Sequence, residues 1–256
     1  MPRPTIVAPV LWCAVVLAAC SNGSTNPNAD GHLRVQLATT GTGATAGPAL
    51  ADVSVTRGSD EIVISEVQLV ARKIKLERAN GTCPTPDLSD TGDGDEEDSD
   101  ECPNLKLGPL LLDPPLGAGA ETSFTVDLPA GTYSELRLQI HKPSDKAKDA
   151  AFLAANPDFA GVSIKVIGTF NGTPFAFTTD VSAEVETEFA HPVIVVADGT
   201  TSLTLLLDVR GWFLSQGGGS LLSPFGVNPL VRSQIEQNIR RSFHAFEDED
   251  HDGEED

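Results

Sequence analysis

Alternating apolar and polar residues constrain the fold of this chain more than any other feature. The alternation is clearest over residues 124–141, FTVDLPAGTYSELRLQIH, where apolar side chains occupy every second position on either side of Pro129-Ala130-Gly131. A period of two directs one face of a strand into a core and the other to solvent. Pro129 fixes φ at a corner, and Gly131 can adopt the positive φ that closes a turn. The stretch therefore predicts two short strands joined by a turn.

The same pattern continues through most of the chain after residue 30, which predicts an all-β sandwich over residues 32–226. Asn171-Gly172 between two alternating runs indicates a tight hairpin. The alternation changes phase after Ala71 within the longest run, which indicates a bulge, although a helix is the alternative at 71–77. A helix is also predicted at 144–155. The expected strands cover residues 32–38, 62–78, 105–112, 162–170, 174–179, 183–189, 193–197 and 202–209, the last two joined through Asp198-Gly199.

The sequence changes character at Asn228-Pro229. Asparagine is a good helix N-cap, and proline favours the first helical position. Apolar side chains then recur every four residues, which is typical of an amphipathic helix. We expect this helix to cover residues 227–246 and to dock on the sandwich. Its apolar stripe comprises Val231, Ile235, Ile239 and Phe243.

Residues 1–19 have the organisation of an export signal. Arg3 precedes an apolar run that is too short to span a bilayer comfortably, and small residues follow it. Leu17-Ala18-Ala19-Cys20 resembles the bacterial lipobox, in which the signal peptidase cuts before a cysteine that carries lipid. An ordinary secretory signal or an N-terminal anchor helix is the alternative. The resemblance implies that Cys20 is lipidated, and Ser21 is similar to the outer-membrane sorting class.

Several acyl chains on Cys20 would anchor the protein stably to the envelope. Residues 20–31 are mostly small and polar, so we expect them to form a flexible tether. In an exported protein, disulfides persist. Cys83 and Cys102 are the cysteines left after export and lipidation, so we expect them to pair. Their bridge would close 18 intervening residues and contribute roughly 3 kcal/mol. Zinc is the alternative, but two thiolates without a nearby histidine fall short of four ligands.

The net charge of −20 is concentrated in two segments. Residues 83–102 contain nine acidic residues and residues 247–256 contain eight, with no lysine or arginine in either. Without these segments and the leader, 20 acidic residues face 16 basic ones, so the remaining body is nearly neutral. We expect a surface insertion at 83–102 and a tail at 247–256, both disordered. This charge excludes a nucleic-acid binder, because phosphate contacts need lysine and arginine.

The acidic tail resembles the start of a calcium-binding loop. Its pattern D-x-D-x-D-G-x-x-D places oxygen ligands at alternate positions and a glycine at the bend. The twelfth position, which supplies the bidentate carboxylate of an EF-hand, is missing. Calcium is therefore a possible cofactor, and a disordered acidic tail is the alternative. The candidate ligands are Asp248, Asp250, Asp252 and Asp256; a weaker set in the insertion comprises Asp90, Asp93, Asp95 and Asp98.

No catalytic constellation is visible, so we expect a protein that is not an enzyme. Hydrolysis needs a nucleophile with its base, or paired carboxylates in a cleft. His141 at a strand end and His191 in an expected loop are interpreted as surface histidines, and Asp208 as a hydrogen-bonded structural carboxylate. Trp212 and Phe213, which precede three consecutive glycines, are either a ligand platform or packing against the C-terminal helix. Packing is the favoured interpretation.

Three motifs resemble a family of uncharacterised bacterial lipoproteins with an all-β domain. These are the L-P-A-G-x-Y turn at 128–133, the G-x-x-N-G-x-P-F hairpin at 168–175, and N-I-R-x-S-F-x-A-F-E-D at 238–248. The resemblance covers most of the chain from about Leu33 onward. It implies an immunoglobulin-like or prealbumin-like β-sandwich, and it assigns no catalytic residue.

The sequence thus predicts a lipid-anchored, non-catalytic envelope protein with a binding or structural role. Its expected partners are the membrane, reached through the N-terminal lipid, and an envelope protein or glycan. A calcium-responsive adhesion or assembly module is the first alternative. An enzyme acting on cell-surface polymers is the second.

Overall fold

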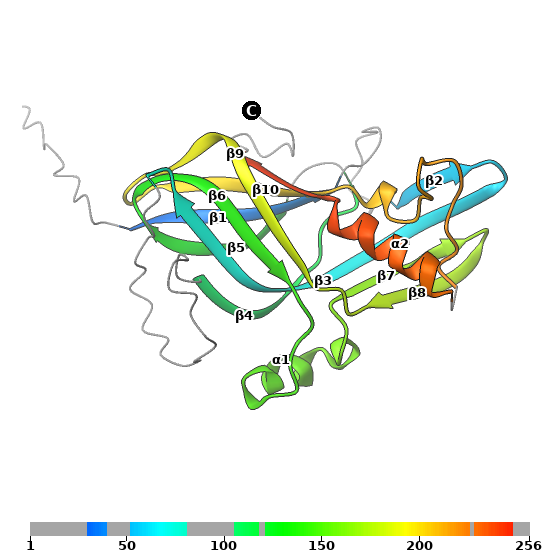
Figure 1. The fold of residues 1–256 in the computed structure, drawn as a ribbon. Coiled ribbons are helices and arrows are strands. Elements are labelled where there is room, and N and C mark those ends of the chain that lie inside the picture. The colour runs from blue at the N-terminus through cyan, green and yellow to red at the C-terminus, as the bar shows by residue number, and fades with distance from the viewer. Residues whose placement is uncertain (1–29, 40–51, 81–104, 118–120, 226–227, 248–256) are drawn as a thin grey trace, which may run out of the picture.

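A computed structural model describes residues 30–39, 52–80, 105–117, 121–225 and 228–247, and it confirms an all-β sandwich with a C-terminal helix (Figure 1). The strands are β1 Asp30–Thr39, β2 Val53–Arg57, β3 Asp60–Arg78, β4 Leu105–Leu112, β5 Glu121–Pro129, β6 Gly131–Ile140, β7 Ile164–Phe170, β8 Thr173–Thr179, β9 Ala183–Val195, β10 Thr200–Leu207 and β11 Phe243–Glu247. The α-helices are α1 Ala150–Ala155 and α2 Pro229–Arg240; short 3₁₀ turns occupy Ala147–Asp149, Pro157–Phe159 and Val209–Gly211. No helix in these ranges is long and apolar enough to span a bilayer.

Two sheets pack face to face. The smaller sheet has the strand order β11-β10-β1-β5, in which β1 and β10 run parallel. The larger sheet has the order β8-β7-β3-β6-β9, and β2 and β4 also pair with β3. One buried cluster, with Ile64, Leu69 and Leu128 fully enclosed, fills the space between them. Burial of this many branched side chains is the main stabilising contribution to such a fold.

Strand β3 is the longest strand and runs through the larger sheet (Figure 1). Its first half pairs with β2 and β7, and its second half pairs with β4 and β6. Register shifts follow Ile64 and Ala71, so the predicted bulge is confirmed. At about 3.3 Å per residue, 19 residues would reach roughly 60 Å if fully extended. The two ends of β3 therefore mark opposite ends of the protein.

The corner at 129–131 differs from the expected turn. Strand β5 belongs to the smaller sheet and β6 to the larger one, so the two strands do not pair with each other. Gly131 is not among the glycines with positive φ, because the chain crosses between layers here instead of folding back. Tyr133 is fully buried, and its hydroxyl donates to the Pro129 carbonyl at 2.7 Å. Burial raises the pKa of this phenol, which keeps it a hydrogen-bond donor.

The other turns agree better with prediction. Asn171 and Gly172, with φ of 51° and 76°, close the β7–β8 hairpin, as predicted. The Asn171 side chain also accepts from the Glu61 N–H at 2.8 Å, which ties this hairpin to the β2–β3 hairpin. Asp198 has a φ of 58°, so the chain does turn before Gly199, but this turn also crosses between the sheets.

The C-terminal helix is shorter than predicted. Helix α2 starts at Pro229 with the Asn228 side chain accepting from the Leu230 N–H, which confirms the predicted N-cap. It ends at Arg240, and the prediction of a helix through residue 246 is wrong. Phe243 begins β11, because pairing with β10 satisfies backbone groups along that edge of the smaller sheet.

Three smaller expectations also need correction. The predicted tether included Asp30 and Gly31, but both belong to β1. His191 lies within β9 rather than in a loop. Strand β2 was missed. It lies between the expected strands 32–38 and 62–78, and it is recognisable only through its antiparallel pairing with β3.

Residues 144–161 form a short helical segment between β6 and β7, and it contains α1, which confirms the predicted helix. One buried carboxylate fixes this segment. The Asp149 side chain is 1% exposed, and its Oδ2 lies 2.7 Å from Arg72 Nη1 on β3. The Ser144 N–H and hydroxyl each donate to the same oxygen at 2.6 Å. Burial raises the pKa of Asp149, but the hydrogen bonds from Ser144 and the Arg72 guanidinium outweigh it, so the pKa lies below its ordinary value.

The lowered pKa of Asp149 predicts a pH-dependent contribution to stability. The contribution is complete above the ordinary carboxyl pKa near 3.8 and is lost as the pH falls through the lower folded value. We expect Asp149→Asn to lower the free energy of unfolding by about 2 kcal/mol at pH 7 and by less at pH 3. Urea unfolding at both pH values measures this. An equal loss at both would contradict the ionised role.

Candidate functional site

Helix α2 presents three different faces, and two of them dock it to the sandwich. The buried face consists of Ile235 and Ile239, which are at most 1% exposed, with Val231 half-buried beside them. Phe243, predicted to complete this stripe, packs in the same core from β11. The apolar face therefore fixes the helix against the larger sheet, as its amphipathic pattern predicts.

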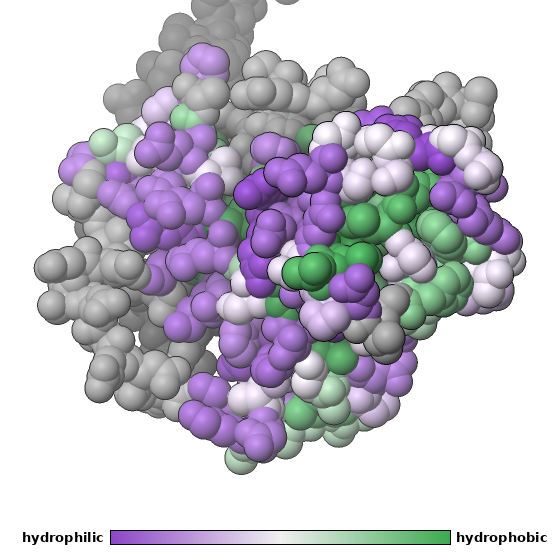
Figure 2. Space-filling model, turned by 45° about the vertical axis from the view of Figure 1, so that its right-hand side comes forward, coloured by the Kyte–Doolittle hydropathy of each residue, from purple (hydrophilic) through white to green (hydrophobic). Residues whose placement is uncertain are grey.

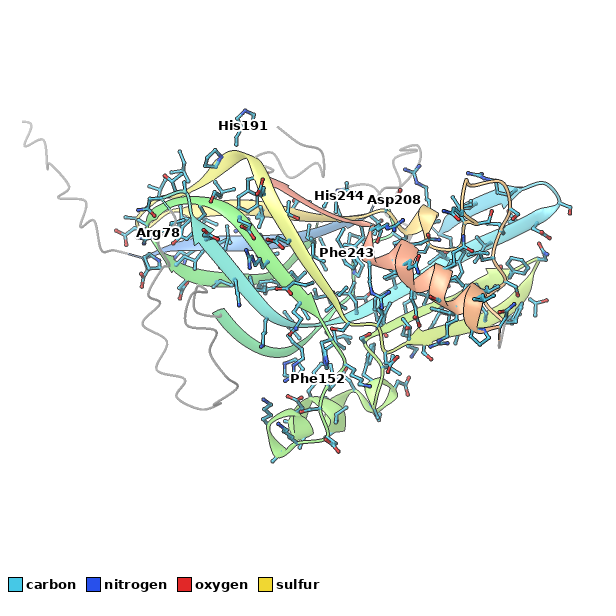
Figure 3. The ribbon with its side chains drawn as sticks, viewed as in Figure 1. Arg78, Phe152, His191, Asp208, Phe243 and His244 are labelled. Atoms are coloured by element: carbon cyan, nitrogen blue, oxygen red, sulfur yellow. The ribbon has the colours of Figure 1, made fainter. Side chains whose placement is uncertain are left out.

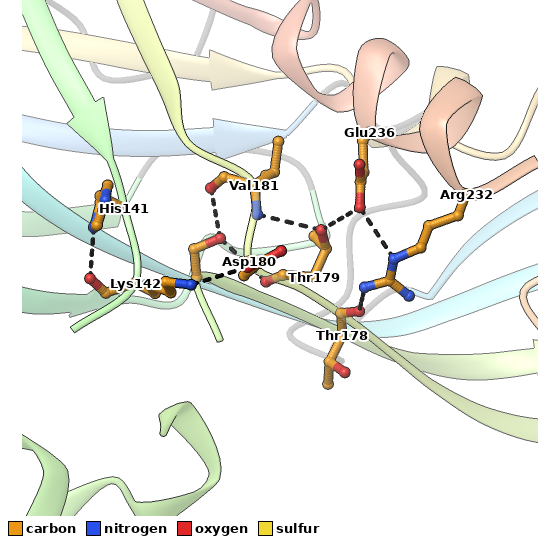
Figure 4. Close-up of polar contacts among 9 residues, drawn as sticks. His141, Lys142, Thr178, Thr179, Asp180, Val181, Arg232 and Glu236 are labelled. Carbon is orange, nitrogen blue, oxygen red and sulfur yellow. Dashed lines mark hydrogen bonds and ion pairs between the residues drawn. The ribbon is translucent and has the colours of Figure 1, made fainter. Parts of the chain in front are cut away.

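The second face of α2 carries its charges and binds the end of β8 (Figure 4). Arg232 Nη2 donates to the Thr178 carbonyl at 2.6 Å, and Arg232 Nε lies 3.2 Å from Glu236 Oε1. The Thr179 hydroxyl donates to the same Glu236 oxygen at 2.7 Å. Further along the helix, Arg240 Nε donates to the Ser182 carbonyl at 3.2 Å. These contacts hold the charged face against the β8–β9 connection.

The third face of α2 borders a groove. Its residues lie three or four positions apart, so they form one side of the helix. The groove has a volume of about 560 Å³, which is within the range of small-ligand sites. The helix face consists of Leu230, Ser233, Gln234, Gln237 and Arg241, with Asn238 beside it.

The opposite wall of the groove is the loop 214–218. Asn238 fixes this loop, since its Nδ2 donates to the Trp212 and Leu214 carbonyls at 3.0 and 2.8 Å. Gly217 and Gly218 have positive φ, and a Cβ on either would meet nothing within 4 Å. The loop is also tied to the end of β2, because Arg57 Nε donates to the Gly218 carbonyl at 2.9 Å. The groove thus has a firmly held loop whose backbone faces open space.

Trp212 and Phe213 precede the loop 214–218 and anchor it in the core. Both are at most 1% exposed. Trp212 Nε1 donates to the Ser242 hydroxyl at 2.7 Å, and Phe213 makes edge contacts with Phe175 and Phe177 at 5.7 and 5.6 Å between ring centroids. Packing, the favoured interpretation of this pair, is therefore confirmed, although the rings that Phe213 contacts belong to β8 rather than to the C-terminal helix.

The groove wall combines neutral hydrogen-bonding groups with apolar side chains. Serine hydroxyls and side-chain amides both donate and accept hydrogen bonds, and no carboxylate is among the described residues that line it. Leu230 and Phe225, 80% and 50% exposed, add apolar surface at this end of the molecule. Figure 2 turns this side forward and shows hydrophobic side chains surrounded by hydrophilic ones. The groove therefore suits an uncharged or anionic ligand rather than a cationic one.

The titratable residues singled out in the sequence do not converge. His141 follows β6, and its Nδ1 lies 2.6 Å from the Lys142 carbonyl. His191 points away from the body of the molecule, well apart from Asp208 (Figure 3). Asp208 follows β10 and accepts from the Arg210 N–H at 3.3 Å, which caps a 3₁₀ turn. Across the described ranges, no three His, Cys, Asp or Glu side chains lie close enough to hold a metal ion.

The other predicted site residues lie outside the described residues. These are the lipidation residue, the two bridging cysteines and the calcium candidates: Cys20, Cys83, Cys102, Asp90, Asp93, Asp95, Asp98, Asp248, Asp250, Asp252 and Asp256. Lipidation, the disulfide and calcium binding therefore stay predictions. The groove itself was missed, although two signals pointed to it: the helical spacing of polar, non-acidic residues after Leu230 and the glycine run at 217–219.

Comparison with known proteins gives little. No protein-family model matches the chain, and no curated protein matches it. Among solved structures, the chain is similar to MbnP from Methylosinus trichosporium, with 14% sequence identity and a TM-score of 0.31. The alignment covers 79% of this chain and 86% of that chain.

The side-chain amide of Asn238 is expected to hold the loop 214–218 in its conformation. We expect Asn238→Ala to cost about 1–2 kcal/mol of unfolding free energy, because two partly buried carbonyls lose their donor. Amide hydrogen exchange in residues 213–218 should also become faster. Mass spectrometry after deuterium labelling measures the exchange, and Gln237→Ala, on the exposed side of the same helix turn, is the control. Equal exchange in both variants would show that Asn238 does not hold the loop.

Proposed function

We propose that this protein is a lipid-anchored, non-catalytic binding module of the cell envelope. It holds an envelope component in the groove between α2 and the loop 214–218. This role agrees with the resemblance of the sequence to uncharacterised bacterial lipoproteins. The observation that carries the proposal is that α2 and the loop 214–218, which border the groove, lie toward the opposite end of the molecule from the start of β1 (Figure 1).

Hydrogen bonds locate the two ends. At the groove end, Arg57 beside the β2–β3 turn donates to Gly218. At the other end, the Asp198 N–H donates to the carbonyl of Asp30, the first described residue. Arg78, the last residue of β3, lies at this same end, because the strand β6 that begins at the 129–131 corner pairs with it through Tyr133.

This arrangement suits a protein anchored through its N-terminus. The ten residues from Cys20 to the start of β1 would reach at most roughly 35 Å. A lipid on Cys20 would therefore hold the Asp30 end near the outer membrane and leave the groove turned away from it. A groove in that position is accessible to periplasmic or surface components, while a groove beside the tether would face lipid headgroups.

A binding role is favoured over catalysis by the chemistry of the groove. Catalytic sites concentrate titratable groups with perturbed pKa values. The described residues of the groove wall instead offer hydroxyl and amide groups with one arginine, and such groups orient a ligand without exchanging protons.

Site-specific photo-crosslinking in intact cells tests the binding role. A photoreactive amino acid is placed at Gln234 or Gln237 on the groove wall, and a control is placed at Thr125, which is exposed on the smaller sheet. We expect a discrete adduct from both groove positions and none of the same mass from Thr125. Identical adducts from all three positions, or none from the groove, would contradict the proposal.

A further inference from the structure

Among the described residues of α2 and its C-cap, the arginines differ in whether their guanidinium groups have a partner. Arg232 and Arg240 donate to backbone carbonyls, and Arg232 also pairs with Glu236, so the face toward β8 and β9 is satisfied. Arg241 lies on the groove face and is exposed. Its guanidinium makes no ion pair with any carboxylate in the described ranges, although acidic residues outnumber basic ones 37 to 17 in the chain.

The surroundings of Arg241 favour an anionic group of the ligand. The described residues of the groove wall include no carboxylate that would compete for the guanidinium. Arginine binds carboxylates through two parallel N–H···O bonds, which fix direction as well as charge. A cation near a helix C-terminus is also favourable for the helix itself, so the charge of Arg241 is compatible with its position whether or not a ligand is bound.

The rest of the face matches an extended peptide. From Leu230 to Arg241 the helix rises by roughly 16 Å, which is the length of about five residues of extended chain. Backbone amides of such a chain each offer a donor and an acceptor, and Gln234 and Gln237 offer the complementary pair. The exposed Leu230, at the opposite end of this face from Arg241, supplies a contact for an apolar side chain.

We propose that the groove binds an extended, uncharged peptide segment that ends in a free carboxylate held by Arg241. This inference rests on the proposed binding function and specifies its ligand class. In this arrangement the amides of α2 contact the peptide backbone, so the carboxylate, more than the side-chain sequence, decides binding. A carbohydrate is a different ligand class, and the test below distinguishes it.

The test uses the purified mature protein and a library of acetylated pentapeptides of uncharged residues, prepared both as free acids and as C-terminal amides. Affinity selection followed by calorimetry on retained peptides should give free acids that bind at least about tenfold more tightly than the matching amides. Arg241→Gln should abolish this difference, and Arg241→Lys should restore part of it. Arg240→Gln, which alters the face toward Ser182, is the matched control and should leave the difference unchanged.

Several results would overturn the inference. These are retention of no peptide, equal affinity for acids and amides, or an unchanged preference in Arg241→Gln while its melting temperature equals that of the parent. A carbohydrate adduct in the crosslinking experiment from Gln237, with no peptide retained, would leave the binding function standing and reject the peptide. Absence of any groove adduct in cells would reject the binding function itself.

Discussion

Replacing Trp212 by alanine is expected to lower the free energy of unfolding by about 4 kcal/mol, because a fully buried indole leaves a cavity that the surrounding sheet cannot refill. The indole also connects three parts of the protein. It follows the 3₁₀ turn Val209–Gly211, it supports the groove loop, and its Nε1 donates to Ser242 between α2 and β11. The loss should therefore loosen α2 as well as the core.

Urea unfolding followed by circular dichroism measures this effect. Ser242→Ala is the matched control, since it removes the hydrogen bond to the indole and leaves the ring in place. We expect it to cost about 1 kcal/mol. A cost below about 1 kcal/mol for Trp212→Ala would contradict the buried position of the ring and, with it, the support that we assign to the groove loop.

Replacing Cys20 by alanine is expected to move the protein almost entirely from the membrane to the soluble fraction or to leave it as an unprocessed precursor. The reason is that the proposed acyl chains on this cysteine would supply the membrane affinity, at about 0.8 kcal/mol per buried methylene. Fractionation of cells and intact-mass measurement check both outcomes. Cys13→Ala, within the expected leader, is the control and should change neither.

A Cys20→Ala variant that still partitions into detergent with an unchanged mass would contradict lipid anchoring. In that case residues 1–19 act as an ordinary signal or an anchor helix, and the groove would no longer be oriented by the tether. The crosslinking experiment would still test separately whether the groove binds an envelope component.

Local patterns in the sequence predict the elements of this fold well. Alternation identifies most strands because each strand has one buried face, and Asn171-Gly172 identifies its hairpin because few residues adopt positive φ. The sheet to which a strand belongs is not a local property. The corner at 129–131 therefore looks like a hairpin in sequence, although β5 and β6 lie in different layers.

The end of α2 shows how a long-range contact overrides a local pattern. Phe243 continues the four-residue apolar spacing of the helix, but it lies in β11, where pairing with Leu207 of β10 is possible. Propensity and spacing do not contain this information, because the partner strand is more than 30 residues away. Helix α2 therefore stops at Arg240.

The groove escaped prediction for a related reason. The polar face of α2, which lacks acidic residues, is visible in the sequence, but a groove requires a second wall, and that wall is a loop fixed by hydrogen bonds from Asn238. Conversely, Trp212 and Phe213 attracted attention as aromatic residues beside glycines, and both are buried. Residue type alone does not distinguish an aromatic ring that packs in the core from one that contacts a ligand.

In our proposal the membrane and the ligand are held at opposite ends of the protein, and a quenching measurement distinguishes this orientation from the reverse one. Lipidated protein is reconstituted into vesicles that contain nitroxide-labelled lipid, with a fluorophore at Thr132→Cys near the tether or at Gln237→Cys on the groove wall. Both positions are exposed. We predict strong quenching at position 132 and little at position 237. Equal quenching at the two positions, or stronger quenching at 237, would contradict the account.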